Sequence, residues 1–239
     1  MPEIVSAGHK PAVEGCGGCH LVTGTGVPST AALAGLPRTY ILEQIAAFRD
    51  DERGVSTVPT LQTMPGEVRS LDDADAQLAA DYFSKMKFVS HTRVVETATV
   101  PKAHWNYFVL RPDRDGAREL LGERIIETPS DFQDYVANDD RGSFIAYVPP
   151  GSIARGGMIA AKGVHGGQAC ESCHGGDLQG VGDIPPLAGR SPTYIVRELI
   201  LFQTRQRTNP AAAPMQLEAT HLTVPEMIDV AAYAASRKP

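Results

Sequence analysis

Cys16-Gly17-Gly18-Cys19-His20 and Cys170-Glu171-Ser172-Cys173-His174 together contain all four cysteines of this 239-residue chain. In each stretch two thiols lie three positions apart on one helical turn, and a histidine follows at once. This spacing attaches a c-type haem, because each thiol adds to a vinyl group of the porphyrin and the imidazole binds the iron. We therefore predict two covalently bound haem c groups, attached through Cys16, Cys19, His20, Cys170, Cys173 and His174.

Three other kinds of site use cysteine pairs of this spacing: a pair of disulfides, a structural zinc site and a redox-active Cys-x-x-Cys. None of them requires a histidine directly after the second cysteine. Both motifs have that histidine, His20 in the first and His174 in the second. The haem interpretation is therefore favoured over the other three.

The sequence around the motifs repeats at a constant distance of 154 residues, the distance from Cys16 to Cys170. Residues 33–49 align with residues 187–203 without a gap. Self-similarity of this kind indicates a duplicated domain. Near the end of each copy the spacing falls to 151, with Tyr82 matching Tyr233, so the second copy lacks three residues between its middle and last helices.

Each copy is predicted to contain the motif, a glycine-rich loop, an amphipathic middle helix, an irregular loop and a closing helix. The closing helices are expected to begin at the caps Asp72 and Thr223, each with a carboxylate three residues later. The middle helices have apolar residues at helical spacing, which are Tyr40, Ile41, Ile45 and Phe48 in the first copy and Tyr194, Ile195, Leu199 and Phe202 in the second.

The two copies differ at their N-terminal ends. Only residues 1–15 precede the first motif, and they include Gly8 and Pro11, so a proper N-terminal helix is not expected there. Residues 153–162 are predicted to form that helix in the second copy. We therefore expect the first haem to be the more exposed of the two.

With these features both copies resemble class I cytochrome c domains, and their tandem arrangement resembles the dihaem cytochromes of the cytochrome c4 group. The resemblance covers about two thirds of the chain, judged from the repeat boundaries. It implies a mainly α fold with two class I cytochrome c domains in tandem and a small α/β insert between them. The expected domains are 1–91 for the first cytochrome, 92–151 for the insert and 152–239 for the second cytochrome.

In class I cytochromes the second axial ligand is a methionine in the irregular loop before the last helix. The matching residues here are Met64 and Met215, which lie 44 and 41 residues after the motif histidines. The resemblance thus implies His20 and Met64 at the first iron and His174 and Met215 at the second. The remaining histidines are expected to be ordinary surface or hydrogen-bonding residues; they are His9, His91, His104, His165 and His221.

One family feature differs between the copies. A proline after the motif commonly supplies the carbonyl that accepts the second imidazole N–H and orients the ring. The second copy has Pro185-Pro186 before its Leu-Ala-Gly, whereas the first has Ala31-Ala32. An alanine carbonyl is also an acceptor, so the hydrogen bond is available in both copies.

Residues 92–151 do not read as a flexible linker, because linkers are poor in aromatic and β-branched residues. Residues 124–127 and 143–148 are predicted strands, and residues 130–135 a short helix capped by Ser130. Residues 105–110 form a third apolar run. We expect a small α/β insert that packs on the cytochrome domains, covers a haem edge and fixes the angle between the domains.

The net charge of −6 disfavours a nucleic acid partner and suggests that docking proteins carry a basic patch. Covalent haem attachment in this family implies assembly outside the bacterial cytoplasm, so a periplasmic location is expected. Residues 1–5 have neither a basic start nor an apolar core, so the chain reads as a mature form without a signal peptide. No apolar run approaches the length of a membrane-spanning helix, so no membrane span is expected.

The resemblance implies a dihaem carrier that passes single electrons between periplasmic donor and acceptor proteins. Two alternatives stay open: a dihaem enzyme of the peroxidase or thiosulfate-oxidising type, and the electron-accepting module of a dehydrogenase complex. An enzyme would need an iron with an open or displaceable ligand position. A methionine available at both irons favours an electron-transfer protein over an enzyme, and no catalytic residue is assigned.

Overall fold

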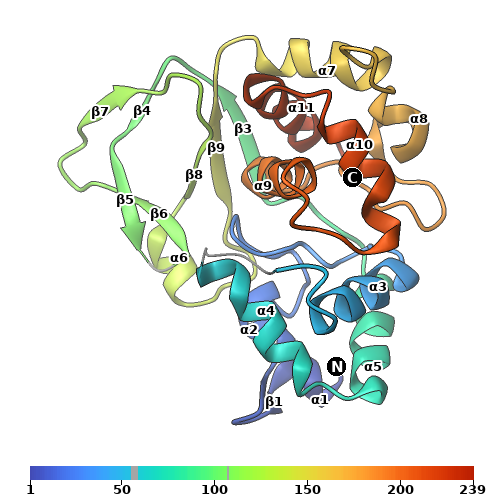
Figure 1. Ribbon diagram of the computed structural model, residues 1–239. Helices are drawn as coiled ribbons and strands as arrows, with labels where there is room; N and C mark the ends of the chain where they lie inside the picture. The colour runs from blue at the N-terminus through green and yellow to red at the C-terminus, as the bar shows by residue number, and fades with distance from the viewer. Residues whose placement is uncertain (55–58, 107) are drawn as a thin grey trace.

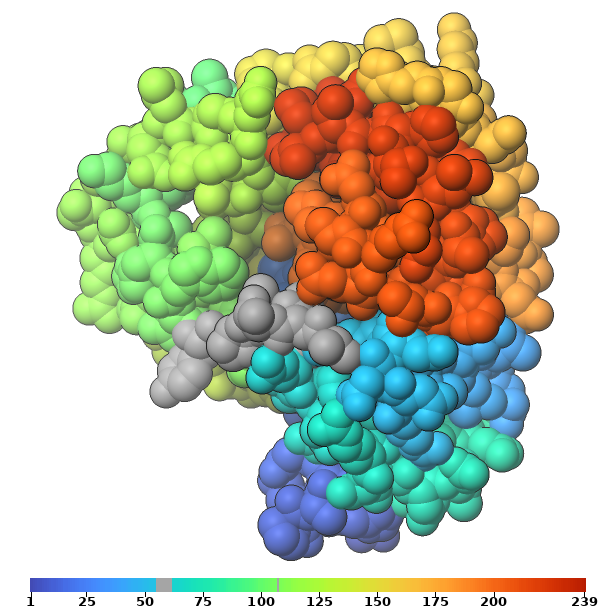
Figure 2. Space-filling model, viewed as in Figure 1, coloured from blue at the N-terminus to red at the C-terminus, as the bar shows by residue number. Residues whose placement is uncertain are grey.

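The computed structural model describes residues 1–54, 59–106 and 108–239. Helices of the two repeats lie at the bottom and upper right of Figure 1, and the strands of the segment between them lie at the left. Figure 2 shows the same three parts in contact, with the second repeat in orange and red above the first in blue and teal. The chain thus folds as two helical repeats with a strand-bearing segment beside them.

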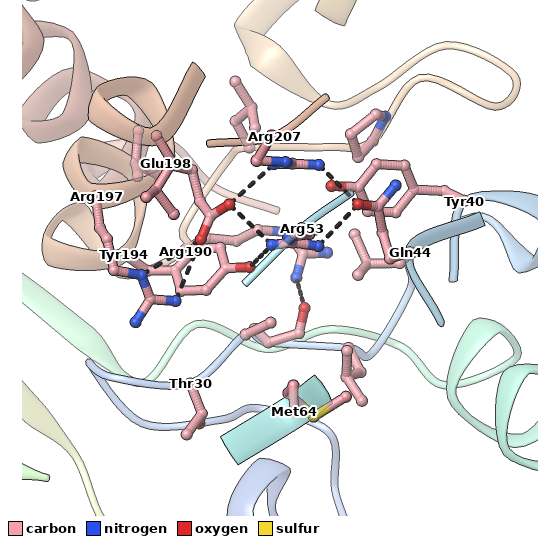
Figure 3. A pocket seen from close by; sticks show the side chains of 18 of the residues that line it. Thr30, Tyr40, Gln44, Arg53, Met64, Arg190, Tyr194, Arg197, Glu198 and Arg207 are labelled. Carbon is pink, nitrogen blue, oxygen red and sulfur yellow. Dashed lines mark hydrogen bonds and ion pairs between the residues drawn. The ribbon is translucent and has the colours of Figure 1, made fainter. Parts of the chain in front are cut away.

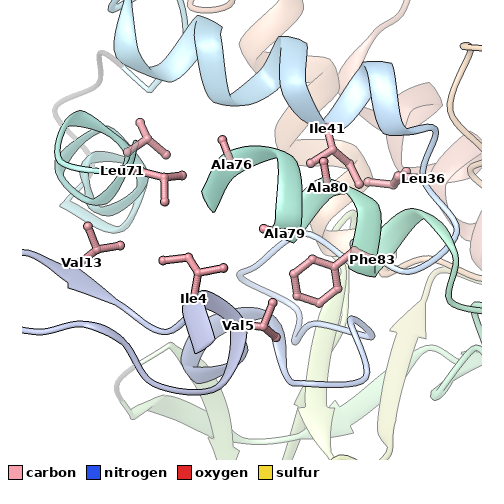
Figure 4. Close-up of a cluster of buried hydrophobic side chains, with 11 residues drawn as sticks. Ile4, Val5, Val13, Leu36, Ile41, Leu71, Ala76, Ala79, Ala80 and Phe83 are labelled. Carbon is pink, nitrogen blue, oxygen red and sulfur yellow. The ribbon is translucent and has the colours of Figure 1, made fainter. Parts of the chain in front are cut away.

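The described residues of the first repeat form five helices and a two-stranded hairpin. Its elements are α1 Glu3–Ser6, β1 Gly8–His9, β2 Val13–Glu14, α2 Cys16–His20, α3 Arg38–Arg49, α4 Pro59–Arg69 and α5 Asp73–Ser84. Figure 4 shows its apolar core, in which α1, α3 and α5 meet. The four-residue helix α1 takes the place where no proper N-terminal helix is expected, because Ile4 and Val5 are almost completely buried against this core.

The second repeat has the same order of helices with a longer N-terminal one. Its elements are α7 Ser152–Lys162, α8 Cys170–His174, the 3-10 turns η1 Gly176–Leu178 and η2 Pro210–Ala212, α9 Pro192–Gln203, α10 Ala213–Ala219 and α11 Val224–Ser236. Helices α7 and α11 touch at Gly156, where a Cβ atom would lie 1.9 Å from the carbonyl oxygen of Asp229. Only glycine fits this contact. The predicted helix over 153–162 is confirmed.

Both closing helices begin at the expected caps. The side chain of Asp72 accepts a hydrogen bond from the backbone N–H of Asp75 (2.8 Å), and Glu226 accepts one from the backbone N–H of Thr223 (2.8 Å). These bonds satisfy amides that a helix N-terminus leaves unpaired.

The segment between the repeats contains seven strands and one short helix among its described residues. They are β3 Thr92–Glu96, β4 Thr99–Pro101, β5 Ala103–Asn106, β6 Val109–Pro112, β7 Arg118–Leu120, β8 Ile126–Pro129, α6 Phe132–Val136 and β9 Phe144–Val148. Strand β9 lies at the centre of a three-stranded sheet, parallel to β3 and antiparallel to β8. The pairs β4–β7 and β5–β6 are antiparallel.

The strands and the helix predicted for this segment are present, but some of them begin at other residues than predicted. The strand expected over 143–148 is confirmed, and the one expected over 124–127 begins two residues later at Ile126. The apolar run 105–110 belongs to two strands rather than one. The short helix is capped by Asp131 instead of Ser130, since Asp131 accepts the backbone N–H of Gln133 at 2.7 Å.

The two repeats meet at a buried polar junction made of residues that correspond in the duplicated sequence (Figure 3). Arg53 and Arg207 lie 154 residues apart and pair through an isolated antiparallel β-bridge. Gln44 of α3 and Glu198 of α9 occupy matching positions. Oε1 of Gln44 accepts hydrogen bonds from Arg53 (2.8 Å) and Arg207 (2.7 Å), and Oε2 of Glu198 accepts from the same two residues (2.8 and 2.9 Å). Each acceptor therefore links both repeats.

The charge of Glu198 is maintained by its arginine neighbours. Burial by itself would raise the pKa of this carboxyl, but the guanidinium groups of Arg53, Arg207 and Arg197 together hold it at about 2. The hydroxyl of Tyr194 accepts a further hydrogen bond from Arg53 at 2.9 Å. Removing one partner from a network of this kind leaves the others buried and unpaired.

We expect Glu198→Ala to lower the free energy of unfolding of the haem-loaded protein by about 3–5 kcal/mol, because two buried guanidinium groups lose their anion. Denaturant unfolding followed by circular dichroism measures this. The matched control is Glu43→Ala, which removes an exposed carboxylate from α3 and should change stability by less than about 0.5 kcal/mol. Equal midpoints for the wild type and Glu198→Ala would show that the junction does not stabilise the fold.

The contribution of Glu198 should also depend on pH. Its pKa in the folded protein, about 2, lies below the ordinary value of 4.5. The stability that the wild type has over Glu198→Gln is therefore present above about pH 4.5 and decreases as the pH falls from there toward 2.

Candidate functional site

The first Cys-x-x-Cys-His motif forms the short helix α2, which turns Cys16, Cys19 and His20 toward one cavity. Gly17 lets this helix pack closely on the chain before and after it, since a Cβ there would lie 2.7 Å from Cγ1 of Val22 and 2.9 Å from the Val5 carbonyl oxygen. His20 is buried, and its Nδ1 lies 2.8 Å from the Ala31 carbonyl oxygen.

The second motif, helix α8, has the same geometry. His174 is as buried as His20, and its Nδ1 lies 2.8 Å from the carbonyl oxygen of Pro185, eleven residues later. The carbonyl expected to orient the ring is therefore present in both repeats, supplied by alanine in one and proline in the other. Glu171 stands where the first motif has Gly17, and it accepts a hydrogen bond from the Tyr233 hydroxyl at 3.2 Å.

These hydrogen bonds fix the tautomer of each imidazole. A carbonyl only accepts, so Nδ1 of His20 and of His174 carries the proton and Nε2 keeps its lone pair for a metal. Burial lowers the pKa of His20, and the charges of Arg53 and Arg197 act in the same direction; burial also lowers the pKa of His174. Both rings are thus held neutral and aimed, as axial ligands must be.

The first cysteine of each motif lies in apolar surroundings. Burial raises the pKa of Cys16 and of Cys170 to about 11. Reactive redox thiols have the opposite property, a pKa lowered by neighbouring cations or a helix N-terminus. The thiols are therefore placed against an apolar surface, as the vinyl edge of a porphyrin requires.

Both motifs open onto one continuous cavity of about 1120 Å³. This volume exceeds the roughly 300–1,000 Å³ of a single small-molecule site. Its walls are mainly apolar, with Ile41, Leu71 and Phe83 at the first motif and Ile195, Leu199 and Leu222 at the second. The cavity thus suits two large apolar groups, one attached to each motif.

Met64 and Met215 line this cavity, each in the repeat whose histidine it was expected to serve. They do not lie in irregular loops as expected, since Met64 is in α4 and Met215 in α10. Both methionines have a helical spacing to an apolar residue: Met64 is followed by Val68 four residues later, and Met215 by Ala219. Val68 and Ala219 are both buried.

The five histidines outside the motifs each have a polar partner in the protein. His9, His104 and His165 lie within 2.9 Å of carboxylates, and His91 and His221 lie within 3.1 Å of backbone carbonyl oxygens. Of these five histidines, His221 lines the cavity, in the second repeat, and the other four are not among its lining residues.

The segment between the repeats contributes to the wall of the first site. Val109 and Phe144 share a buried cluster with Leu21 and Val27, which follow the first motif. The residues of this segment that line the cavity are Asn106, Phe108, Phe132, Tyr135, Val136 and Asn138. His20 and His174 have the same exposed fraction, 7 %, and the expectation that the first haem is the more exposed stays a prediction.

Four arginines face the cavity where the repeats meet, and sequence reasoning missed them; they are Arg53, Arg190, Arg197 and Arg207. Three of them bond to one carboxylate, that of Glu198. Within the described part of the chain, Nε of Arg207 is buried without a hydrogen-bond partner. This excess of cationic donors fits the carboxylate groups that a haem carries. The available signal was the 154-residue spacing that relates Arg53 to Arg207.

No family model matches the chain. Among curated proteins it is similar to cytochrome c-552 of Acidithiobacillus ferridurans, with 28% identity over 229 residues, 92% of this chain and 73% of the relative. It is 24% identical over 234 residues to the thiosulfate dehydrogenase electron acceptor of Thiomonas intermedia, 97% of this chain and 82% of the relative. Cytochrome c-554(548) of Halomonas halodenitrificans is 37% identical over 70 residues, which are 29% of this chain and 84% of that protein.

Solved structures with a similar fold include two that share about a quarter of their sequence with this chain. Cytochrome c4 of Acidithiobacillus ferrooxidans has a TM-score of 0.59 and 25% identity, covering 92% of this chain and 98% of that one. Thiosulfate dehydrogenase TsdBA of Marichromatium purpuratum has a TM-score of 0.66 and 24% identity. The latter match covers 98% of this chain but only 39% of the other, so this chain spans about two fifths of that protein.

The helices of the described residues are too short or too polar to cross a membrane. Two motifs with aimed, neutral imidazoles open onto one apolar cavity, and the relatives along most of the chain are cytochromes. The chain therefore belongs to the c-type cytochromes, as a dihaem, cytochrome c4-like electron-transfer protein with two covalently bound haem c groups.

Proposed function

We propose that this protein carries single electrons between periplasmic redox proteins, with His20 and Met64 as ligands of the first iron and His174 and Met215 as ligands of the second. The observation that carries the proposal is that each half of the cavity presents one oriented imidazole and one thioether. A thioether is a soft, neutral ligand that suits reduced iron, and a site with both axial positions filled has no vacancy for a substrate.

Haem, when bound, supplies reversible one-electron chemistry. The residues of the protein position the haem ligands and form the surroundings of each haem site. The carbonyls of Ala31 and Pro185 fix the two imidazoles, and the walls of both sites are mainly apolar. The arginines that line the cavity at the junction would offer donors to the carboxylates of a bound haem. A periplasmic location is supported by covalent attachment, which requires assembly outside the cytoplasm.

A second candidate is more specific: the protein accepts electrons from a thiosulfate dehydrogenase. Similarity to the thiosulfate dehydrogenase electron acceptor of Thiomonas intermedia extends over 97% of this chain. The similarity to TsdBA covers 98% of it. In this role the oxidation of thiosulfate takes place in the partner enzyme, and this chain receives the electrons.

We also propose that residues 1–91, 92–151 and 152–239 are three structural units and that the middle one covers the first haem. Support comes from the cavity-lining side chains of Phe132 and Tyr135 and from the cluster that joins Val109 to Leu21. On the side of the second repeat, the Ser191 hydroxyl donates to Oε2 of Glu127 in β8 at 2.7 Å. The middle unit is thus connected to both repeats.

Replacing Met64 or Met215 by Ala should remove the methionine–iron charge-transfer absorption of one site and let the reduced protein bind carbon monoxide there. Absorption spectra of the oxidised protein and carbon monoxide titration of the reduced protein measure the two effects. Met158→Ala is the matched control, because Met158 is 58% exposed on α7. An unchanged spectrum in Met64→Ala or Met215→Ala would reject that methionine as the ligand.

The carrier proposal predicts that the fully reduced wild-type protein binds little carbon monoxide and turns over neither peroxide nor thiosulfate by itself. Steady turnover together with stoichiometric carbon monoxide binding at one haem would overturn it in favour of a dihaem enzyme.

For the second candidate, a purified thiosulfate dehydrogenase with thiosulfate should reduce both haems, as followed by stopped-flow absorbance. Failure of that reduction, with no turnover, would reject thiosulfate dehydrogenase as the donor and leave the carrier role.

If the middle unit holds the two repeats together, limited proteolysis between Val94 and Pro150 should be slow in the native protein. Mass spectrometry of the digest identifies the cut sites. Rapid cleavage there into two separately folded cytochromes would show that the segment is only a tether.

A further inference from the structure

In the first repeat a carboxylate ties the helix that carries Met64 to the haem motif. Glu67 lies three residues after Met64 on α4 and is half-buried. Its Oε2 accepts a hydrogen bond from the backbone N–H of Glu14 at 2.8 Å. Glu14 ends β2, two residues before Cys16, the first cysteine of the motif. Glu67 therefore connects the helix that bears the thioether with the segment that bears the thiols and the imidazole.

The second repeat contains the same tie, made by the corresponding residues. Glu218 lies three residues after Met215 on α10, and its Oε2 accepts a hydrogen bond from the backbone N–H of Gln168 at 2.7 Å. Gln168 likewise lies two residues before the first cysteine, Cys170. The two segments are close here, because a Cβ at Gly167 would lie 3.1 Å from Oε2 of Glu218. The donor comes from the main chain in both repeats, so the tie does not depend on the donor's side chain.

A second tie joins the last turn of each methionine helix, α4 or α10, to the end of the middle helix. Arg49 of α3 donates from Nε to the Val68 carbonyl oxygen at 3.1 Å, and Gln203 of α9 donates from Nε2 to the Ala219 carbonyl oxygen at 2.9 Å. Arg49 and Gln203 occupy corresponding positions, as do Val68 and Ala219. These bonds satisfy carbonyls that the end of a helix leaves unpaired. Each methionine helix is thus held from two sides, by the middle helix and by the motif.

We infer that Glu67 and Glu218 are positioning residues that keep the two methionines on their irons. The histidine belongs to the motif and the thioether to the methionine helix, so both ligands reach one iron only while these two segments stay together. The glutamate bond joins the segments directly, and a hydrogen bond to a carboxylate is stronger than one between neutral groups.

The inference rests on the proposed ligation by Met64 and Met215 and adds what maintains it. A firmly held thioether keeps the axial position closed, as an electron carrier requires. When the glutamate is removed, the methionine helix loses its bond to the motif while both thiols and the histidine remain. The site should then admit small external ligands although the haem stays attached.

The test is a titration of the oxidised holoprotein with imidazole, followed by the loss of methionine–iron absorption, with the spectra of Met64→Ala and Met215→Ala assigning each step to a haem. Imidazole binds where the methionine has left, so its apparent dissociation constant reports the fraction of open sites. In Glu67→Ala this constant should fall about tenfold at the first haem, as expected for the loss of a hydrogen bond to a charged group. The second haem should be unchanged, and Glu218→Ala should show the reverse pattern.

Two further variants separate the hydrogen bond from the charge. Glu67→Gln keeps an oxygen that accepts the Glu14 N–H, so its imidazole constant should lie closer to that of the wild type than to that of Glu67→Ala. The matched control is Glu14→Ala, which removes a carboxylate but keeps the N–H donor; the Glu14 side chain pairs with Lys10 at 2.9 Å on the surface. This control should leave the imidazole constant unchanged. Hydrogen exchange of the amide at position 14, measured by NMR, should be faster in Glu67→Ala than in Glu67→Gln.

Equal imidazole constants in the wild type, Glu67→Ala and Glu218→Ala, with methionine–iron absorption present, would overturn the positioning role and leave the proposed function intact. Equal changes at both haems in either variant would also overturn it, because they indicate general loosening of the fold. A wild type without methionine–iron absorption would instead reject the methionine ligation, and the inference with it. If Glu67→Ala fails to fold with its haems attached, Glu218→Ala decides the question in the second repeat.

Discussion

The buried carboxylate of Glu198, held between Arg53 and Arg207, is the interaction on which the arrangement of this molecule depends. It joins one arginine from each repeat, and Gln44 repeats the same bridge on the other side of the pair. A buried charge is tolerated only where partners surround it, so the two repeats are constrained to one relative position. The shared cavity, with a haem motif at each end, follows from that position.

Duplication gave both repeats the same way of orienting a ligand. His20 and His174 each bond, at the same distance, to a carbonyl eleven residues further on. A carbonyl is available from any residue, so Ala31 serves as well as Pro185. The side chains around this shared geometry differ between the repeats. Arg190 and Arg197 match Leu36 and Glu43 in the first repeat, and Phe132 and Tyr135 of the middle segment line the cavity at the first site.

Several features were predictable because they depend on neighbours in sequence. The haem motifs, the repeat, the caps at Asp72 and Thr223 and the helix over 153–162 are all local patterns. The methionines were found through the family resemblance, but their helices were not predicted. The paired strands of the middle segment were only partly anticipated, since β3 pairs with β9 across about fifty residues and pairing at that distance has no local signature.

The sequence by itself determined the cofactor, its number and the duplicated helical fold, because thiol spacing and apolar periodicity are set along the chain. Only the tertiary structure decided that Arg190 and Arg197 contact residues 29–34 of the other repeat and that Phe132 and Tyr135 line the cavity at the first site. These contacts join residues about 100 to 170 positions apart. Their physical basis is the burial of charge and apolar surface between segments, which exists only after the repeats have met.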